Sequence, residues 1–138
     1  METAAVLLRR LTMLDACTDV AIDELAAHVE PLLVDPGYVL MSEGDTDREA
    51  YLVIEGRASV LRAGRRVMTI GAGEFIGEMA KLSRKPRSAT VVAATPMTLL
   101  VVSPEEFDAF TNHPAVSLHL TESLSRRVKK ALESLERP

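Results

Sequence analysis

One short stretch of the chain, residues 73–91, carries the residue types best suited to chemistry. A glycine and a carboxylate stand together at Gly77 and Glu78, and an arginine and a serine follow at Arg87 and Ser88. Unpaired N–H groups at a helix start and a guanidinium both donate strong hydrogen bonds to phosphate oxygens. We therefore predict that a helical turn follows Gly77 and that Arg87 binds the phosphate of a small sugar phosphate.

The other polar groups of the stretch fit the same ligand. An ionised Glu78 only accepts hydrogen bonds, and a sugar hydroxyl is a natural donor to it. Pro86 fixes the backbone angle just before Arg87, and Ser88 adds a hydroxyl donor beside the guanidinium. A cyclic nucleotide offers a phosphodiester charge, a ribose 2'-hydroxyl and a flat base, and the first two match these groups.

Each of these residues also has a simpler interpretation. Arg87 can belong to a solvated basic loop, and Glu78 can be an ordinary charge favoured by the helix dipole. Gly77 can be a plain turn residue. The other basic residues of that loop are Lys81, Arg84 and Lys85. The ligand interpretation is favoured because the groups occur together in this order, directly before an apolar strand that starts near Ala89.

Composition limits the classes of protein and of partner. A chain of 138 residues with 47% apolar residues predicts a single domain over residues 1–138. Its net charge of -4 argues against a surface that coats nucleic acid or an anionic membrane. The apolar run from Ala4 to Leu8 is too short for a signal peptide or a membrane span. Cys17 is the only cysteine, which excludes an intrachain disulfide and suits a cytoplasmic protein.

Apolar spacing divides the chain into three parts. Helical spacing covers residues 4–28, a β part covers residues 29–102, and two C-terminal helices are expected over residues 104–136. About eight short strands with turns between them predict an antiparallel, jelly-roll-like β-roll. We expect strands that are neighbours in the chain to pair as hairpins, for example through the turns at residues 55–57 and 63–65. The predicted fold class is mainly β with flanking α-helices.

The C-terminal part predicts one short and one long helix. Residues 103–106, Ser-Pro-Glu-Glu, have the composition of a capping box, so the first helix should begin there. The second should run from Ala115 to about Leu135, with an apolar seam that packs on the roll or, as the alternative, pairs with a second copy. The seam residues are Leu124, Val128, Ala131 and Leu135, and the basic residues Arg126, Arg127, Lys129 and Lys130 lie largely off the seam.

Residues 75–80 are Phe-Ile-Gly-Glu-Met-Ala and residues 86–91 are Pro-Arg-Ser-Ala-Thr-Val. These blocks resemble the phosphate-binding cassette of cyclic nucleotide-binding domains, which occur in catabolite activator proteins, cyclic-nucleotide-dependent kinases and gated channels. Upstream blocks are similar to the family's two glycine-punctuated signatures. Those blocks are residues 36–40, 43–45 and 51–57. The resemblance covers about residues 20–135 and implies a β-roll with flanking helices.

The resemblance also implies a role for each candidate residue. Glu78 would bind the ribose 2'-hydroxyl, Arg87 and Ser88 the cyclic phosphate, and the backbone of residues 77–80 would make the remaining phosphate contacts. The strand around Val67 would line the base pocket, and the last helix would close over the base as a lid. The candidate ligand-binding residues are Gly77, Glu78, Met79, Ala80, Arg87, Ser88, Ala89, Val67 and Leu132.

Two departures from the family pattern concern the ligand. Lys81 stands where leucine is common, and the lid stretch is Lys130-Ala131-Leu132 where cyclic-AMP-activated transcription factors place hydroxyl side chains toward adenine. Leu132 would then cap the base by apolar contact. Ser88, where many cyclic-GMP binders carry threonine, favours cyclic AMP over cyclic GMP. No cofactor besides this ligand, and no metal, is expected.

The main hypothesis is a cyclic-nucleotide sensor or regulatory domain that acts on an effector. The alternative is an interaction or dimerisation module that kept the fold and lost the ligand. An enzyme is not expected, because His28, His113 and His119 are scattered and make no catalytic or metal-binding set. The chain ends at Pro138, so we expect no DNA-reading helix-turn-helix and no DNA binding by this chain alone.

Overall fold

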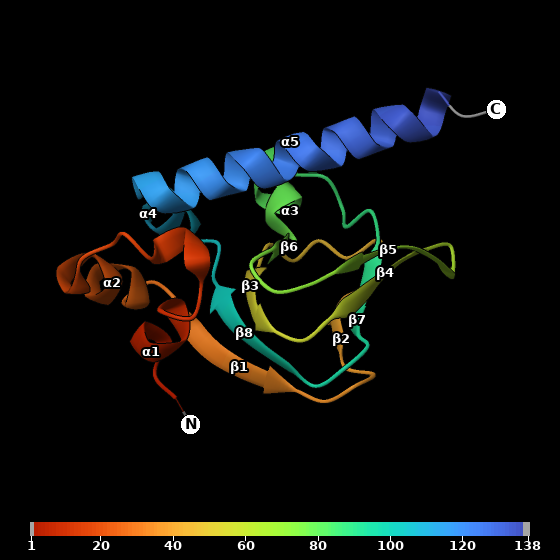
Figure 1. Ribbon diagram of the computed structural model, residues 1–138. Helices are drawn as coiled ribbons and strands as arrows, with labels where there is room; N and C mark the ends of the chain where they lie inside the picture. Colours follow the sequence, from red (N-terminus) through yellow and green to blue (C-terminus); the bar gives the residue numbers. More distant parts are fainter. Residues whose placement is uncertain (1, 137–138) are drawn as a thin grey trace.

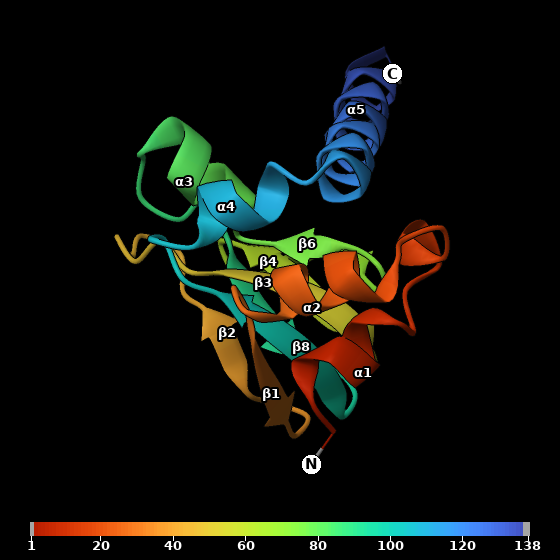
Figure 2. The ribbon, with the colours of Figure 1, turned by 90° about the vertical axis from the view of Figure 1, so that its left-hand side faces the viewer.

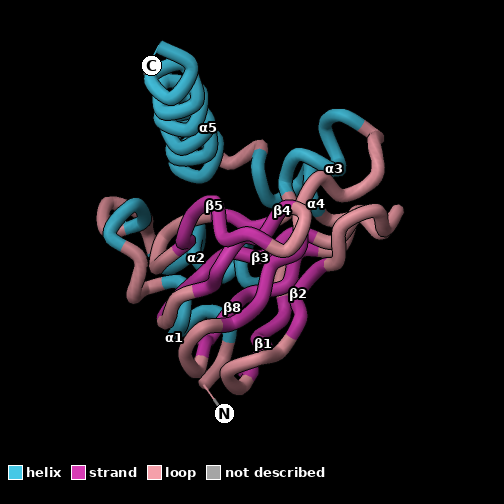
Figure 3. The backbone as a smooth tube through the Cα atoms, turned by 90° about the vertical axis from the view of Figure 1, so that its right-hand side faces the viewer, coloured by secondary structure: helices cyan, strands magenta, loops and turns pink. Residues whose placement is uncertain are grey.

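Two four-stranded antiparallel sheets form the centre of the molecule and confirm the predicted fold class, a β-roll with flanking helices. The computed structural model describes residues 2–136, without the side chains of residues 81, 82, 131, 134 and 136. The strand orders are β1-β8-β3-β6 and β2-β7-β4-β5. Figure 3 shows the strands grouped at the centre with the helices around them. The strands are β1 (Glu30–Val34), β2 (Val39–Met41), β3 (Ala50–Glu55), β4 (Ala58–Arg62), β5 (Arg65–Ile70), β6 (Phe75–Ile76), β7 (Thr90–Ala93) and β8 (Met97–Val102).

Three short helical segments precede the roll and cover one sheet. They are α1 (Ala4–Leu8), η1 (Thr12–Leu14) and α2 (Asp19–Ala26). The Thr18 hydroxyl caps α2 by accepting a hydrogen bond from the Ala21 N–H at 3.2 Å. Figures 1 and 2 show α1 and α2 beside β1 and β8.

Strand β3 is buried on both faces from Ala50 to Ile54, and only its last residue, Glu55, is exposed. Ala50, Leu52 and Ile54 point into the cluster shared with the helices, whereas Tyr51 and Val53 point into the interior between the two sheets. Successive side chains of a strand alternate between its two faces, so a strand that is covered on both faces has apolar residues in succession and no alternation of apolar and polar residues. The sheet that contains β3 is therefore the middle layer of the molecule.

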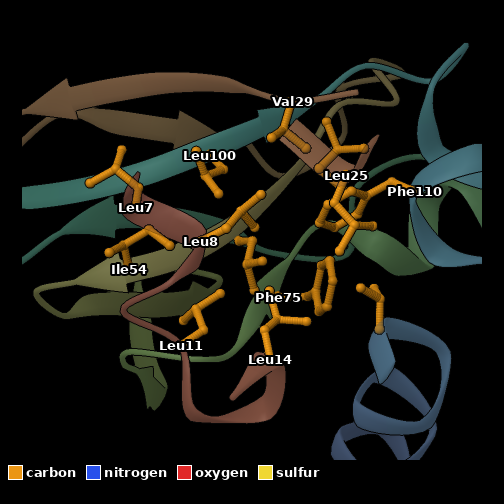
Figure 4. Packing of buried hydrophobic residues seen from close by; sticks show 14 of the residues in the cluster. Leu7, Leu8, Leu11, Leu14, Leu25, Val29, Ile54, Phe75, Leu100 and Phe110 are labelled. Atoms are coloured by element: carbon orange, nitrogen blue, oxygen red, sulfur yellow. The ribbon is translucent and has the colours of Figure 1, made fainter. Parts of the chain in front are cut away.

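The outer of these two clusters joins segments that are far apart in the sequence. Figure 4 shows Leu7 and Leu8 of α1, Phe75 of β6 and Phe110 of the C-terminal helix α4 (Phe107–Thr111) in one packed group. The rings of Phe75 and Phe110 meet edge to face, with centroids 6.4 Å apart. Phe75 is the first residue of the candidate cassette, so this cluster fixes the strand from which the site starts.

The expectation of hairpins between chain neighbours is wrong for most of the roll. Among the described strands, only β4 and β5 are both consecutive and paired, whereas β3 and β4 belong to different sheets. The turn between β3 and β4 contains Gly56, which has φ 96°. A Cβ at Gly56 would lie 2.4 Å from the Pro96 carbonyl oxygen. Without a Cβ, Gly56 lets the chain pass close to the β7–β8 turn as it crosses from one sheet to the other. The local sequence of such a crossover does not differ from that of a hairpin turn.

The predicted capping box is also wrong. Helix α4 begins at Phe107, three residues later than the capping-box motif places the first turn, and its N-cap Glu106 makes no side-chain cap bond. The Glu106 carboxylate instead lies 2.5 Å from the His28 imidazole, at the end of the N-terminal helical part. The contact with His28 therefore engages the carboxylate that the capping box would use.

Helix α5 spans Pro114–Glu136 and crosses the end of the roll where β6 lies (Figure 1). Val116 and Leu120 are buried and Leu124 is partly buried against the core. The predicted seam does not continue onto the roll, because Val128 is 58% exposed and Leu135 is 82% exposed. Ala131, the remaining seam residue, has a side chain outside the described ones. None of the described helices has the length and apolar character required to cross a membrane.

Candidate ligand-binding site

The cassette forms a short helix between β6 and β7. Helix α3 spans Glu78–Ser83, close to the helical turn expected after Gly77. Gly77 precedes it with φ 80°, a left-handed conformation that glycine adopts without steric cost. The Ala80 N–H donates to the Gly77 carbonyl at 3.3 Å. The N–H groups before it have no acceptor one turn earlier in the helix, so an anion can bind there.

Arg87 is buried and is held by four hydrogen bonds. Its Nε and Nη2 donate to the Asp47 carboxylate at 3.3 and 2.7 Å. Nη2 also donates to the Glu49 carbonyl at 2.5 Å, and Nη1 donates to the Gly77 carbonyl at 2.9 Å. The solvated-loop interpretation of Arg87 is therefore wrong, since its residue is only 3% exposed. The guanidinium instead connects the β2–β3 loop to the start of the cassette.

Asp47 is a site residue that sequence reasoning missed. Hydrogen bonds from Arg87 hold the pKa of the Asp47 carboxyl below its usual value. The loop is positioned by two backbone bonds, from the Arg87 N–H to the Asp45 carbonyl at 2.7 Å and from the Gly44 N–H to the Arg87 carbonyl at 2.8 Å. Several acidic residues alternate through this loop, and nothing local in the sequence singles out Asp47.

Glu78 is buried and is paired with an arginine from the last helix. Its carboxylate accepts a hydrogen bond from Arg127 Nη1, and Arg127 Nη2 donates to the Phe75 carbonyl at 2.7 Å. Burial raises the pKa of the Glu78 carboxyl, and the Arg127 charge partly opposes this shift. Arg127 was expected to lie off the packed face of the helix, and the structure instead places it against the cassette.

The remaining candidate residues divide into two groups. Within the cassette, Ala80 and Ala89 are buried, while Ser88 and Met79 are exposed. Val67 on β5 is half exposed, and Leu132 on α5 is 54% exposed. Leu132 follows Arg127 by five residues, which turns it by about 140° around the helix axis and away from the side that meets Glu78. In this arrangement Leu132 does not cover the cassette.

Two further observations concern other kinds of site. An open cleft of about 760 Å³ is lined by the turns around Asp35, Gly56 and Pro96, and none of the candidate residues lines it. Among the described residues, no three potential metal-ligating side chains form a group.

Comparison with known proteins identifies the family. A family model described as "Cyclic nucleotide-binding domain" matches residues 32–113, which include the whole cassette. The chain belongs to the cyclic nucleotide-binding domain family. The resemblance seen in the two cassette blocks is thereby confirmed.

Individual relatives of this cyclic nucleotide-binding domain are larger proteins. Acetyltransferase Pat from Mycolicibacterium smegmatis is 35% identical over 138 residues, covering 97% of this chain and 39% of that protein. A solved structure of a mutant cAMP-binding acyltransferase from Mycobacterium smegmatis aligns with TM-score 0.80 and 31% identity, over 92% of this chain and 41% of that chain. The Thermus thermophilus catabolite activator protein aligns with TM-score 0.74 and 28% identity, over 90% and 61% of the two chains. The chain spans 26% to 39% of the length of the first three curated relatives.

The buried carboxyl of this cyclic nucleotide-binding domain predicts a pH effect on stability. The pKa of Glu78 is above its usual 4.5 in the folded state, so the carboxyl's stabilising contribution is complete below about pH 4.5 and is lost as pH rises through the folded pKa. Glutamine does not titrate. We expect the stability of the parent relative to Glu78→Gln to fall as pH rises from 4 to 8, measured by urea unfolding. A difference that grows with pH would contradict this sign.

Proposed function

We propose that this domain binds a cyclic nucleotide, cyclic AMP in preference to cyclic GMP, as a sensor or regulatory domain. The observation that carries the proposal is the hydrogen bonding of the Arg87 guanidinium. A guanidinium has five N–H donors, and hydrogen bonds between described residues use four of them. The remaining N–H is on Nη1, the nitrogen that donates to the Gly77 carbonyl at the start of α3. A phosphate bound at the first N–H groups of α3 would accept a hydrogen bond from this remaining N–H.

The fixed position of Arg87 lowers the entropy cost of binding a phosphate. A side chain that is already ordered by Asp47 and two carbonyls loses little conformational entropy when a ligand arrives. The Asp47 carboxylate also compensates the buried charge before the ligand binds. We propose that Ser88 adds a hydroxyl donor and that the backbone of residues 77–80 supplies the remaining phosphate contacts.

Glu78 is proposed to accept a hydrogen bond from the ribose 2'-hydroxyl. It is the first residue of α3, so a ligand whose phosphate meets the helix start places its sugar next to this carboxylate. The small buried residues Ala80 and Ala89 pack around the cassette backbone, and we propose that Met79 and Val67 offer apolar surface to ribose and base. Ser88 favours cyclic AMP.

Movement of α5 is proposed as the output. Leu132 is exposed and faces away from the cassette, so contact with the base requires α5 to rotate or shift. Ligand drives such a change only through its affinity difference between the two states. The relatives support a regulatory role, since they include a cAMP-binding acyltransferase and a cAMP-dependent protein kinase regulatory subunit. We propose that this domain is not itself catalytic and that a separate effector carries the output.

A second candidate function is an interaction module, for example a homodimer through α5. It is favoured by the exposed apolar side chains along that helix and by the pairing of both Arg87 and Glu78 within the chain. The exposed side chains are Leu118, Val128, Leu132 and Leu135. This candidate predicts self-association without nucleotide affinity.

Titration calorimetry of the nucleotide-free chain separates the two candidates. We expect saturable binding of cyclic AMP, weaker binding of cyclic GMP, and much weaker binding of 5'-AMP, whose phosphate does not form the ring. The 5'-AMP arm controls for simple charge attraction. Sedimentation analysis of the same sample measures self-association. Absence of heat with both cyclic nucleotides, together with a stable dimer, would replace the sensor by the interaction module.

A further inference from the structure

The last helix is tied to the cassette by two polar side chains. Arg127 binds the Glu78 carboxylate and the Phe75 carbonyl, and about two turns earlier the His119 imidazole contacts the Gly73 carbonyl. All three partners lie in the segment that leads through β6 into α3. Helix α5 is therefore attached to the residues that start the proposed ligand site.

Arg127 covers the group that the proposed ligand needs. The Glu78 side chain is 2% exposed, while the Arg127 side chain that binds it is 25% exposed. Arg127 is therefore the more solvent-exposed partner of the pair and covers part of the carboxylate. The hydroxyl is also a neutral donor, and it replaces an ionic partner only if the phosphate contributes binding at the same time.

The Arg127 guanidinium is held incompletely in this position. Its Nε is buried, and among the described residues it has no hydrogen-bond partner. A buried N–H without an acceptor costs free energy that water would return on release. Arginine also has a long side chain, so it can swing to solvent without unfolding the helix.

We propose that Arg127 competes with the ribose 2'-hydroxyl for Glu78, so that ligand binding breaks this contact and frees α5 for the movement proposed above as the output. This inference rests on the proposed cyclic nucleotide binding and adds a residue that sets its affinity. The competition is specific to ribose, because the phosphate contacts of Arg87 do not involve Arg127. By linkage, whatever strengthens the Arg127–Glu78 pair weakens the ligand, and the ligand weakens the pair by the same factor.

The chain offers a matched control for this competition. Arg126 is the adjacent arginine; it is exposed, and its nearest recorded side-chain partner is the Ser123 hydroxyl at 3.5 Å. Arg126→Ala and Arg127→Ala remove the same charge from the same helix turn. Any difference between them in ligand affinity reports the Glu78 contact and not the overall field of the protein.

The test measures cyclic AMP and 2'-deoxy cyclic AMP binding to the parent, Arg127→Ala and Arg126→Ala by titration calorimetry, with thermal unfolding of each variant. We expect Arg127→Ala to bind cyclic AMP on the order of tenfold more tightly than the parent. We expect Arg126→Ala to match the parent. The gain should vanish with the 2'-deoxy ligand, which has no hydroxyl to place on Glu78. Arg127→Lys, which keeps the charge without the guanidinium fork, should bind with intermediate affinity.

The outcomes separate this inference from the proposed function. A parent that binds cyclic AMP together with an Arg127→Ala variant that binds equally or more weakly would overturn the competition and leave the sensor assignment intact. An equal gain for both ligands would overturn it too, because the effect would not pass through the 2'-hydroxyl. If no variant binds either nucleotide, the proposed function fails, and the competition fails with it.

Discussion

Arg87→Ala is expected to reduce cyclic AMP affinity on the order of a hundredfold, because Arg87 is, among the described residues, the only buried cation that contacts the start of α3. It is also expected to destabilise the fold by about 3 kcal/mol, since a buried arginine is lost from an ion pair and from two carbonyls. Titration calorimetry and urea unfolding measure the two effects.

The control for Arg87→Ala is Lys85→Ala, which removes one positive charge from an exposed residue of the same loop. It should leave both affinity and stability close to the parent values. Because the Arg87 variant loses stability, binding is measured where unfolding curves show that the variant is folded. A folded Arg87→Ala protein that keeps cyclic AMP affinity within threefold would contradict the phosphate role.

Gly77→Ala is the second substitution with a large expected effect. Its φ of 80° costs an L-residue about 1–2 kcal/mol. The added Cβ would also lie 2.5 Å from Arg87 Nη1 and 3.0 Å from the Glu49 carbonyl oxygen. The Glu49 oxygen belongs to the backbone, so the clash is relieved mainly by displacing the Arg87 guanidinium, which strains its four hydrogen bonds. We expect a total loss of about 3 kcal/mol and an affinity loss on the order of tenfold or more.

Gly73→Ala separates backbone strain from the clash. Gly73 has φ 84°, and a Cβ there would meet nothing within 4 Å. It should therefore show the strain cost of about 1–2 kcal/mol with an almost unchanged cyclic AMP affinity. Equal affinity losses for the two alanine variants would mean that contact with Arg87 is not what makes Gly77 important.

The sequence predicted the fold class and the helical turn after Gly77. The ligand-binding roles of Glu78 and Arg87 stay predictions. These predictions depended on signals that are local or almost local: strand lengths, turn glycines, and Gly77, Glu78 and Arg87 within one loop and one turn. The pairing of the strands depends on contacts between residues that are far apart in the chain, so local signals did not predict it. The crossover at Gly56 is decided by its contact with the Pro96 carbonyl, which lies 40 residues away in the chain.

The two site residues that were missed share the same physical reason. Asp47 and Arg127 reach the cassette from other elements, and each was one of several similar charges in its own segment. Their partners are selected by backbone geometry, through the Arg87–Asp45 bond in one case and the packing of α5 in the other. Glu106 is the opposite case: a local pattern predicted a capping box, but a distant residue, His28, contacts the carboxylate instead.

Amide-resolved NMR of the nucleotide-free chain, titrated with cyclic AMP, tests directly whether the nucleotide binds at the cassette. We expect saturable shifts of the amides of residues 77–80 and Arg87, with accompanying shifts at Asp47 and along α5 around Arg127. Shifts confined to other surfaces, such as the cleft around Gly56 and Pro96, or no shifts at millimolar nucleotide, would contradict it.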